Sequence, residues 1–185
     1  MSSHETEGKN DLLSMLRREE AGLFLGGSRV VIAPALLLGM LGAVMERLFG
    51  HQGADAAFRE AAYRAGVACG ANVHEMLVER GVEDPWEMVR VLVEHVMPGL
   101  GWGEFQLVEM RKQPLRIVVR VSKPYVEVTG ISSSESPICY PMKWLLAGVL
   151  KVVLSEAGFS GDLEAEEVKC VAMGDPHCEV VFREA

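Results

Sequence analysis

The chain has 185 residues, is 49% apolar and carries a formal net charge of −8, which suits one soluble domain with a substantial core. The acidic balance, without any basic stripe, argues against direct binding to nucleic acid. The longest apolar runs contain Gly or Lys and fall short of the ~20 residues that span a bilayer. The polar start shows no signal-peptide pattern, so we expect a cytoplasmic protein without a membrane span.

The first third of the chain predicts a short tail followed by mixed elements. We expect residues 1–10 to be a disordered tail and residues 11–185 to form a single domain. Asn10 and Asp11 can cap a helix over residues 12–20, and β-branched residues predict a strand over 29–32. Pro34 in a first turn predicts a helix that continues to about Phe49.

After a break at residues 50–53, a second helix is predicted over 54–79, and a third over 86–96. The second helix is thin because many of its residues are small: Ala61, Ala65, Gly66, Ala68, Gly70 and Ala71. Such residues permit close helix packing, and they also leave room for a ligand between helix and sheet. Both interpretations stay open on the sequence alone.

The last part of the chain changes to strand patterns. Strands are predicted over 104–110, 115–121 and 126–128, followed by a helix over 141–157 and a closing hairpin over 163–182. Helices followed by strands, with one helix before the final hairpin, predict an α+β domain with an antiparallel sheet.

The closing hairpin carries a potential metal site. Cys170 and Cys178 flank the turn signal Gly174-Asp175-Pro176, and alternation predicts that Val168 shares a face with Cys170. Cys139 lies in the loop before the last helix, and Glu167 lies three residues before Cys170.

Three thiolates and a carboxylate are the ligand types of a tetrahedral zinc ion. Four protein ligands leave no open position, so such a site is structural. The alternative is that the cysteines are buried small apolar residues without a metal. His177 is a competing fourth ligand, but neighbouring residues of a strand point to opposite faces, which favours Glu167.

Aromatic residues suggest an apolar binding cavity, although filling the core is the alternative for each of them. The candidate ligand contacts are Phe58, Cys69, Trp102, Phe105, Tyr140 and Trp144, with Cys69 expected to be an inert thiol. No nucleophile with an adjacent base, phosphate-binding loop or dinucleotide fingerprint is found, which favours a non-catalytic module and leaves enzyme activity open.

The tail resembles the 4-vinyl reductase domain family through the pattern E-x-x-C-x-A-x-G-D-x-x-C, which starts at Glu167 and ends at Cys178. Residues 62–66, 101–105 and 137–139, with Ala147-Gly148 in the helix that follows, extend the resemblance to roughly residues 29–182. The resemblance implies a TRAPP/Bet3-like fold, in which helices pack on a twisted antiparallel sheet, and a domain that is usually dimeric.

The resemblance also implies a function. In the family's sensors of aromatic compounds, zinc is held by four residues that correspond here to Cys139, Glu167, Cys170 and Cys178. We therefore expect a sensor or carrier of a small hydrophobic ligand, braced by structural zinc and forming a homodimer. Neither an ATPase module nor a helix-turn-helix follows in this sequence, so a free-standing regulator would act through a protein partner.

Two alternatives belong to other classes. One is an accessory protein or reductase component of tetrapyrrole (bacteriochlorophyll-type) metabolism, as the family name suggests. The other is a structural adaptor for protein assembly, with a filled core.

Overall fold

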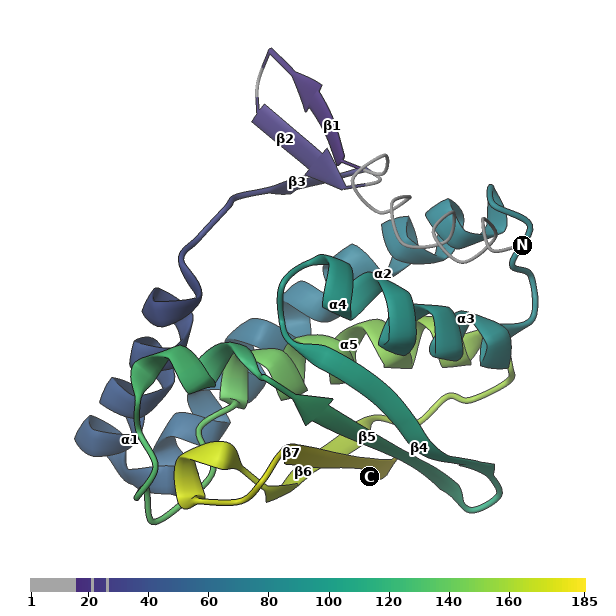
Figure 1. The fold of residues 1–185 in the computed structure, drawn as a ribbon. Helices are drawn as coiled ribbons and strands as arrows, with labels where there is room; N and C mark the ends of the chain where they lie inside the picture. Colours follow the sequence, from purple (N-terminus) through teal and green to yellow (C-terminus); the bar gives the residue numbers. More distant parts are fainter. Residues whose placement is uncertain (1–15, 21, 26) are drawn as a thin grey trace, which may run out of the picture.

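A four-stranded antiparallel sheet of order β4-β5-β7-β6 forms the base of the molecule (Figure 1). The computed structural model describes residues 16–20, 22–25 and 27–185. The strands are β4 (Glu104–Lys112), β5 (Leu115–Ser122), β6 (Leu163–Lys169) and β7 (Cys178–Glu184). Strands β5 and β7 lie in the centre and turn Ile117, Val119, Val180 and Phe182 into the core. The expected α+β class with an antiparallel sheet is confirmed.

Helix α5 (Tyr140–Ser155) lies in the middle of the molecule, between the sheet and helix α2 (Arg64–Val78). Its apolar residues surround the helix on almost all sides, as expected for a helix that is buried all round. The two helices approach closely where Gly66 meets Gly148, because a Cβ at either position would collide with a backbone carbonyl oxygen of the facing helical segment. The small residues of α2 therefore serve close packing, and α5 occupies the space between α2 and the sheet.

The long helical segment before α5 bends once. Helix α1 (Ala35–Phe58) continues through the π-helical turn η2 (Arg59–Tyr63) into α2. The break predicted at residues 50–53 is reduced to a kink at Gly50, which has a φ of 68° that suits glycine. Helices α3 (Pro85–Val91), η3 (Leu92–Val96) and α4 (Met97–Gly99) then lead to β4, with Asp84 capping α3.

The predicted helix over residues 12–20 is wrong where the structure describes it. Residues 16–19 form strand β1 (Leu16–Glu19), which pairs with β2 (Gly22–Leu25), and β2 pairs with β3 (Ser28–Val30). A short helix is marginal on its own, and pairing with β2 offers this segment backbone hydrogen bonds that do not depend on helix formation. The expected tail over residues 1–10 lies outside the described residues.

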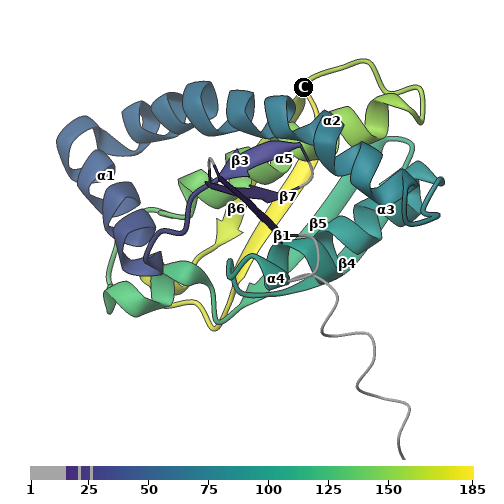
Figure 2. The same ribbon diagram turned by 90° about the horizontal axis from the view of Figure 1, so that it is seen from above.

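The small sheet lies over α5, between α2 on one side and α3 and α4 on the other (Figure 2). Asn72 of α2 donates a side-chain hydrogen bond of 2.8 Å to the hydroxyl of Ser28, which ties β3 to the helical layer. Within the described part of the chain, no helix has both the length and the apolar character needed to cross a membrane.

The predicted strand over residues 126–128 is also wrong. These residues belong to the 3₁₀ helix η4 (Tyr125–Thr129), between Pro124 and Gly130. Helix α1 packs against this turn through Gly39, since a Cβ there would lie 2.6 Å from Cγ2 of Thr129. The β-branched residues are used here to pack against a helix instead of to extend the sheet.

Candidate functional site: a buried Cys3Glu cluster and an apolar cavity

A bulge in β6 decides which side chains of the hairpin face the core. The pairing of β6 with β7 shifts between Glu167 and Lys169, so Val168 is pushed outward and is 45% exposed. The expectation that Val168 shares a face with Cys170 is therefore wrong. The extra residue turns Glu167 and Cys170 to the same buried side, although residues three apart in a regular strand point to opposite faces.

The hairpin loop fixes Cys170 and Cys178 beside each other. The chain passes through η5 (Val171–Met173) and turns at Gly174, which has a φ of 92°. The Asp175 carboxylate accepts a 2.9 Å hydrogen bond from the backbone N–H of Cys170. The backbone N–H of Val171 donates to Sγ of Cys178 over 3.4 Å.

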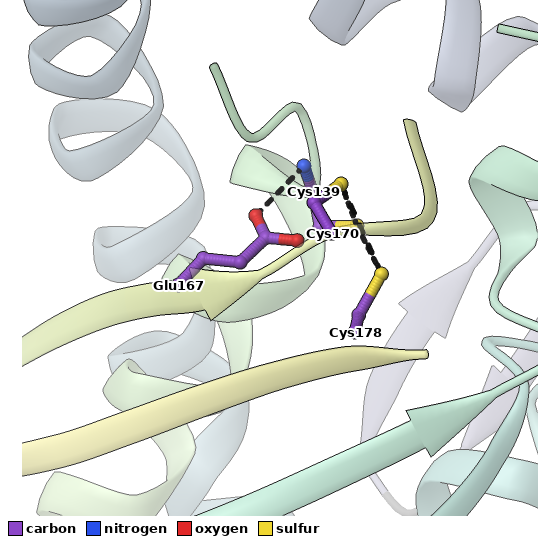
Figure 3. A group of neighbouring side chains, drawn as sticks. All are labelled: Cys139, Glu167, Cys170 and Cys178. Atoms are coloured by element: carbon purple, nitrogen blue, oxygen red, sulfur yellow. Dashed lines mark hydrogen bonds between the residues drawn. The ribbon is translucent and has the colours of Figure 1, made fainter. Parts of the chain in front are cut away.

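Cys139, Glu167, Cys170 and Cys178 converge at one buried point (Figure 3). Cys139 comes from the N-terminal end of α5, and the other three come from the hairpin. The Sγ atom of Cys139 lies 3.5 Å from that of Cys178 and 4.0 Å from that of Cys170. The third sulfur pair is separated by 3.9 Å, and all four ligand atoms lie within 4.8 Å of one another.

These distances fit a tetrahedral metal ion. Zinc–sulfur bonds of about 2.3 Å at tetrahedral angles place two sulfurs about 3.8 Å apart. The observed sulfur–sulfur separations lie on both sides of that value. All four cysteines of the chain are free thiols, so no disulfide competes for these sulfurs.

The Glu167 carboxylate has one oxygen in use and one without a partner. Its Oε2 accepts a 3.1 Å hydrogen bond from the backbone N–H of Cys139. Its Oε1 is buried and has no hydrogen-bond partner among the described residues. An unpaired buried carboxylate oxygen is costly, and coordination of a cation beside the sulfurs relieves that cost.

Without a metal, the cluster holds its protons unevenly. Hydrogen bonds from Cys139 and Cys178 lower the pKa of the Cys170 thiol to about 2, so this residue carries the negative charge. Burial raises the pKa of Cys139 and of Glu167 well above their ordinary values. Metal binding would therefore displace protons from the cluster.

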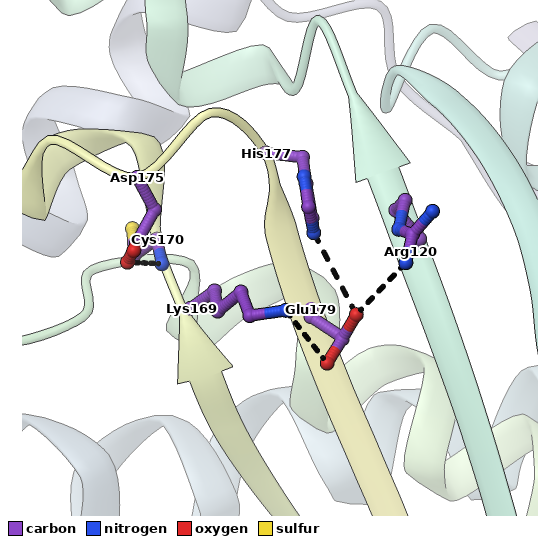
Figure 4. A network of polar contacts seen from close by, with 6 residues as sticks. All are labelled: Arg120, Lys169, Cys170, Asp175, His177 and Glu179. Atoms are coloured by element: carbon purple, nitrogen blue, oxygen red, sulfur yellow. Dashed lines mark hydrogen bonds and ion pairs between the residues drawn. The ribbon is translucent and has the colours of Figure 1, made fainter.

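The opposite face of the hairpin carries a charged network (Figure 4). Glu179 accepts hydrogen bonds from Lys169 over 3.3 Å and from Arg120 over 3.5 Å, which links three strands. His177 points to the same carboxylate, with 3.6 Å between Nε2 and Oε2. His177 thus lies away from the sulfurs, as alternation along a strand predicts.

An apolar cavity of about 390 Å³ lies between the small N-terminal sheet and the helical layer. Its lining residues are Leu16, Leu25, Val30, Val31, Ile32, Ala33, Ala35, Leu38, Gly99, Leu100, Gly101, Trp102, Tyr125 and Leu145. The cavity falls within the usual range of small-molecule sites, which is about 300–1,000 Å³ and mostly apolar.

The structure separates the six candidate ligand contacts. Trp102 lines the apolar cavity and packs edge-on against Tyr125, with ring centroids 5.1 Å apart. Phe58 and Tyr140 stack on each other at 5.7 Å and fill core space. The remaining three lie outside the cavity: Phe105 is buried on β4, Cys69 is half-buried on α2, and Trp144 is buried on α5.

Most of the cavity's lining was not identified from the sequence. The run over residues 30–33 was interpreted as part of a core strand, but Val31 and Ile32 lie beyond β3 and are 86% and 84% exposed. Their apolar character directly before Pro34 was the available signal. Tyr125 gave no signal, because its position depends on the packing of η4 against α1.

A second, polar cavity of about 430 Å³ lies beside the Cys3Glu cluster, and Glu167 is part of its wall. Lys143 is buried there and forms an ion pair of 2.5 Å with Asp55. Asp55 also accepts a 3.0 Å hydrogen bond from the indole of Trp144. The hydroxyl of Tyr140 and Nδ1 of His51 form a 2.8 Å hydrogen bond. The sequence analysis missed the Lys143–Asp55 pair.

Comparison with known proteins places this architecture in the TRAPP-like α+β class. Residues 118–184, which hold most of β5, α5, the hairpin and the whole Cys3Glu cluster, match the family model of the vinyl-4-reductase domain. The resemblance to the 4-vinyl reductase domain family is thereby confirmed. A search of curated protein sequences finds no significant match.

Solved structures share the fold at low sequence identity. The phenol-responsive sensory domain of the transcription activator PoxR, with phenol, matches with a TM-score of 0.76 and 16% identity, covering 100% of this chain and 92% of that chain. A trafficking protein particle complex subunit 3 from Naegleria fowleri, covalently bound to palmitic acid, matches with a TM-score of 0.51 and 14% identity (82% and 95% covered). A vinyl-4-reductase family protein from Methanocaldococcus jannaschii has a TM-score of 0.50 and 17% identity (85% and 84% covered).

Proposed function

We propose that this chain is a non-catalytic cytoplasmic sensor domain that binds a small apolar or aromatic molecule and is braced by structural zinc. The observation that carries the ligand proposal is the apolar cavity, which the small N-terminal sheet, the start of α1 and Leu145 of α5 enclose together. A ligand there contacts three separate elements, so its binding can bias their arrangement and change the surface offered to a protein partner.

The comparisons support this class of function. A structure that covers this whole chain is described as a phenol-responsive sensory domain with phenol, and another TRAPP-like structure holds palmitic acid. The cavity's mostly apolar lining suits molecules of the same general chemistry, with few polar groups.

Calorimetric titration with phenol and with a short alkylbenzene tests the proposal. We expect saturable binding with a negative heat-capacity change, because apolar surface is buried. Ala35→Phe places a ring in the cavity and should weaken binding at least about tenfold, since a filled site excludes the ligand. Ala57→Phe is the matched control, because Ala57 is an exposed residue elsewhere on α1.

Two results would contradict the ligand proposal. The first is the absence of binding by any aromatic or alkyl probe to folded protein. The second is equal binding by Ala35→Phe and Ala57→Phe. Binding of a porphyrin, seen as a shifted Soret band, with no response to small aromatics would instead support the tetrapyrrole alternative.

The zinc proposal rests on the four buried ligand atoms within 4.8 Å of one another and on the unpartnered Oε1 of Glu167. Zinc would supply a cross-link between the start of α5 and the hairpin, whose binding free energy adds to folding stability. The residues themselves hold Cys139 against the hairpin through the hydrogen bond to Glu167.

Metal analysis of protein purified without chelator should give one zinc per chain. Cys139→Ala should lower this ratio to well below one, whereas Cys69→Ala should leave it unchanged, because Cys69 lies outside the cluster. A ratio near zero in the wild type, with all thiols free to react, would remove zinc from the account.

We further infer that two chains pair through an exposed face of α1. Leu37, Met40, Leu41, Val44 and Leu48 lie on one side of this helix and are 41–65% exposed. A stripe without charges is self-complementary, as the two-fold interface of a homodimer requires. Its exposure in a single chain is otherwise unfavourable.

Light scattering after size exclusion tests the dimer. Wild type should have the mass of two chains, and Leu41→Glu combined with Leu48→Glu should have the mass of one. Ala57→Glu is the control outside the stripe. A monomeric wild type at micromolar concentration would contradict the pairing.

A further inference from the structure

Tyr125 belongs to both the apolar cavity and the surroundings of the Cys3Glu cluster. Its ring is part of the cavity lining, where it packs edge-on against Trp102. Its backbone N–H also donates a 3.1 Å hydrogen bond to the carbonyl of Trp102. The two aromatic residues therefore form one joined section of the cavity wall.

The hydroxyl of the same residue is buried and has no partner. Tyr125 is 3% exposed, and its hydroxyl oxygen is one of four buried side-chain atoms without a hydrogen bond among the described residues. A buried phenol hydroxyl usually finds a partner, so this one indicates a missing acceptor.

The groups around this hydroxyl are those of the cluster. Burial, followed by the charges of Cys139, Glu167, Cys178 and Cys170, raises the pKa of Tyr125 well above its ordinary value. The backbone supports this placement, because β5 pairs Val121 with Cys178 and then leads through Pro124 into Tyr125. The ring thus lines the cavity while the hydroxyl lies in the electrostatic field of the sulfurs.

We propose that Tyr125 couples the occupancy of the apolar cavity to metal loading of the Cys3Glu cluster. In the metal-free cluster, two of the three sulfurs hold protons that they share among themselves. With a metal bound, all three are thiolates, and a thiolate is a better acceptor for the hydroxyl of Tyr125. That hydrogen bond fixes the ring, and with it the cavity wall that a ligand contacts.

The coupling is reciprocal, because a ligand that holds the ring in place also holds the hydroxyl against the sulfurs. Metal should therefore raise ligand affinity, and ligand should slow metal loss. This inference rests on the proposed function, and it makes Tyr125 a positioning residue for both sites.

The test measures phenol affinity of the full chain with and without zinc, in the wild type and in Tyr125→Phe. We expect zinc removal to weaken phenol binding at least about fivefold in the wild type and less than about twofold in Tyr125→Phe. Tyr63→Phe is the matched control, since its hydroxyl bonds Asp162 at the surface, and it should behave as the wild type. Equal zinc dependence in wild type and Tyr125→Phe would overturn the proposal.

A second readout does not need the ligand. Cobalt(II) replaces zinc in thiolate sites and reports sulfur donation through its charge-transfer absorption. Tyr125→Phe should shift this absorption and accelerate cobalt loss to a chelator, whereas Tyr63→Phe should do neither. Trp102→Leu keeps the hydroxyl and should leave the cobalt spectrum unchanged while weakening phenol binding.

The two readouts separate the possible failures. If no variant binds phenol but Tyr125→Phe alters the cobalt site, the ligand proposal fails and the contact between Tyr125 and the cluster stands. If phenol binds and the cobalt site is unaffected by Tyr125→Phe, the coupling fails and the ligand proposal stands.

Discussion

Glu167 has two tasks at the scale of single residues. One carboxylate oxygen orders the start of α5 by accepting from the backbone of Cys139, and the other is left free beside three sulfurs. The bulge at Val168 makes this possible, because it rotates Glu167 and Cys170 to the same side. A carboxylate with this arrangement combines the role of ligand with that of a structural acceptor.

Glu167→Gln keeps the shape of the side chain and removes its charge. We expect the affinity for zinc to fall at least about tenfold, because the change of an outer-shell partner alone often costs that much. Competition with a chromogenic chelator measures the affinity. Glu166→Gln is the control, since Glu166 is exposed and pairs with Arg183 on the other face. Unchanged affinity in Glu167→Gln would exclude the carboxylate as a ligand.

Lys143 is buried beneath the polar cavity with Asp55 as its ion-pair partner. Asp55→Asn leaves this lysine without a counter-charge, so we expect the free energy of unfolding to fall by about 3 kcal/mol. Urea denaturation measures the change. Glu60→Gln breaks an exposed helical pair with Arg64 and should cost less than about 0.5 kcal/mol. Equal losses in the two variants would contradict the special role of the buried pair.

At the scale of elements, the contact between α2 and α5 determines the thickness of the helical layer. Gly148→Ala introduces a Cβ that collides with backbone atoms of Tyr63 and Val67, which a small side-chain movement cannot relieve. We expect a loss of about 3 kcal/mol or more in unfolding free energy. Ala68→Ser changes an exposed position of α2 and should be nearly neutral. A stable Gly148→Ala variant would show that the helices can separate.

The connection from α5 to β6 is held by a surface ion pair. A hydrogen bond from Lys151 and its charge lower the pKa of Asp162. Because the folded pKa is depressed, the pair stabilises the fold above the unfolded pKa of about 3.9, and this contribution disappears as the pH falls through the folded value. In an NMR titration, Lys151→Met should move the pKa of Asp162 upward. No movement would contradict the assigned cause.

Local patterns predicted the elements whose neighbours are close in the sequence. The helix that starts near Pro141, the β5 strand and the hairpin around Gly174 carry their own periodicity and turn residues. Residues 16–19 and 126–128 were wrong because their conformation depends on distant partners, β2 and α1 respectively. The cavity was missed for the same reason, since its lining comes from separated segments of the chain.

At the scale of the whole molecule, α5 connects the two proposed sites. Cys139 precedes its first turn, and Leu145, further along the helix, reaches the apolar cavity. The helix is enclosed by the sheet, α2 and α1, so it cannot shift without disturbing one of these contacts. A domain built in this way can transmit a change at the cavity to the hairpin and to an exposed face of α1.

The central claim is that the start of α5 and the closing hairpin are joined through one metal ion. X-ray absorption at the zinc edge of the purified chain measures this directly. We predict three sulfur neighbours at about 2.3 Å and one oxygen at about 2.0–2.2 Å, with one sulfur lost in Cys139→Ala. A coordination shell of light atoms alone, or a spectrum that Cys139→Ala does not change, would contradict the account.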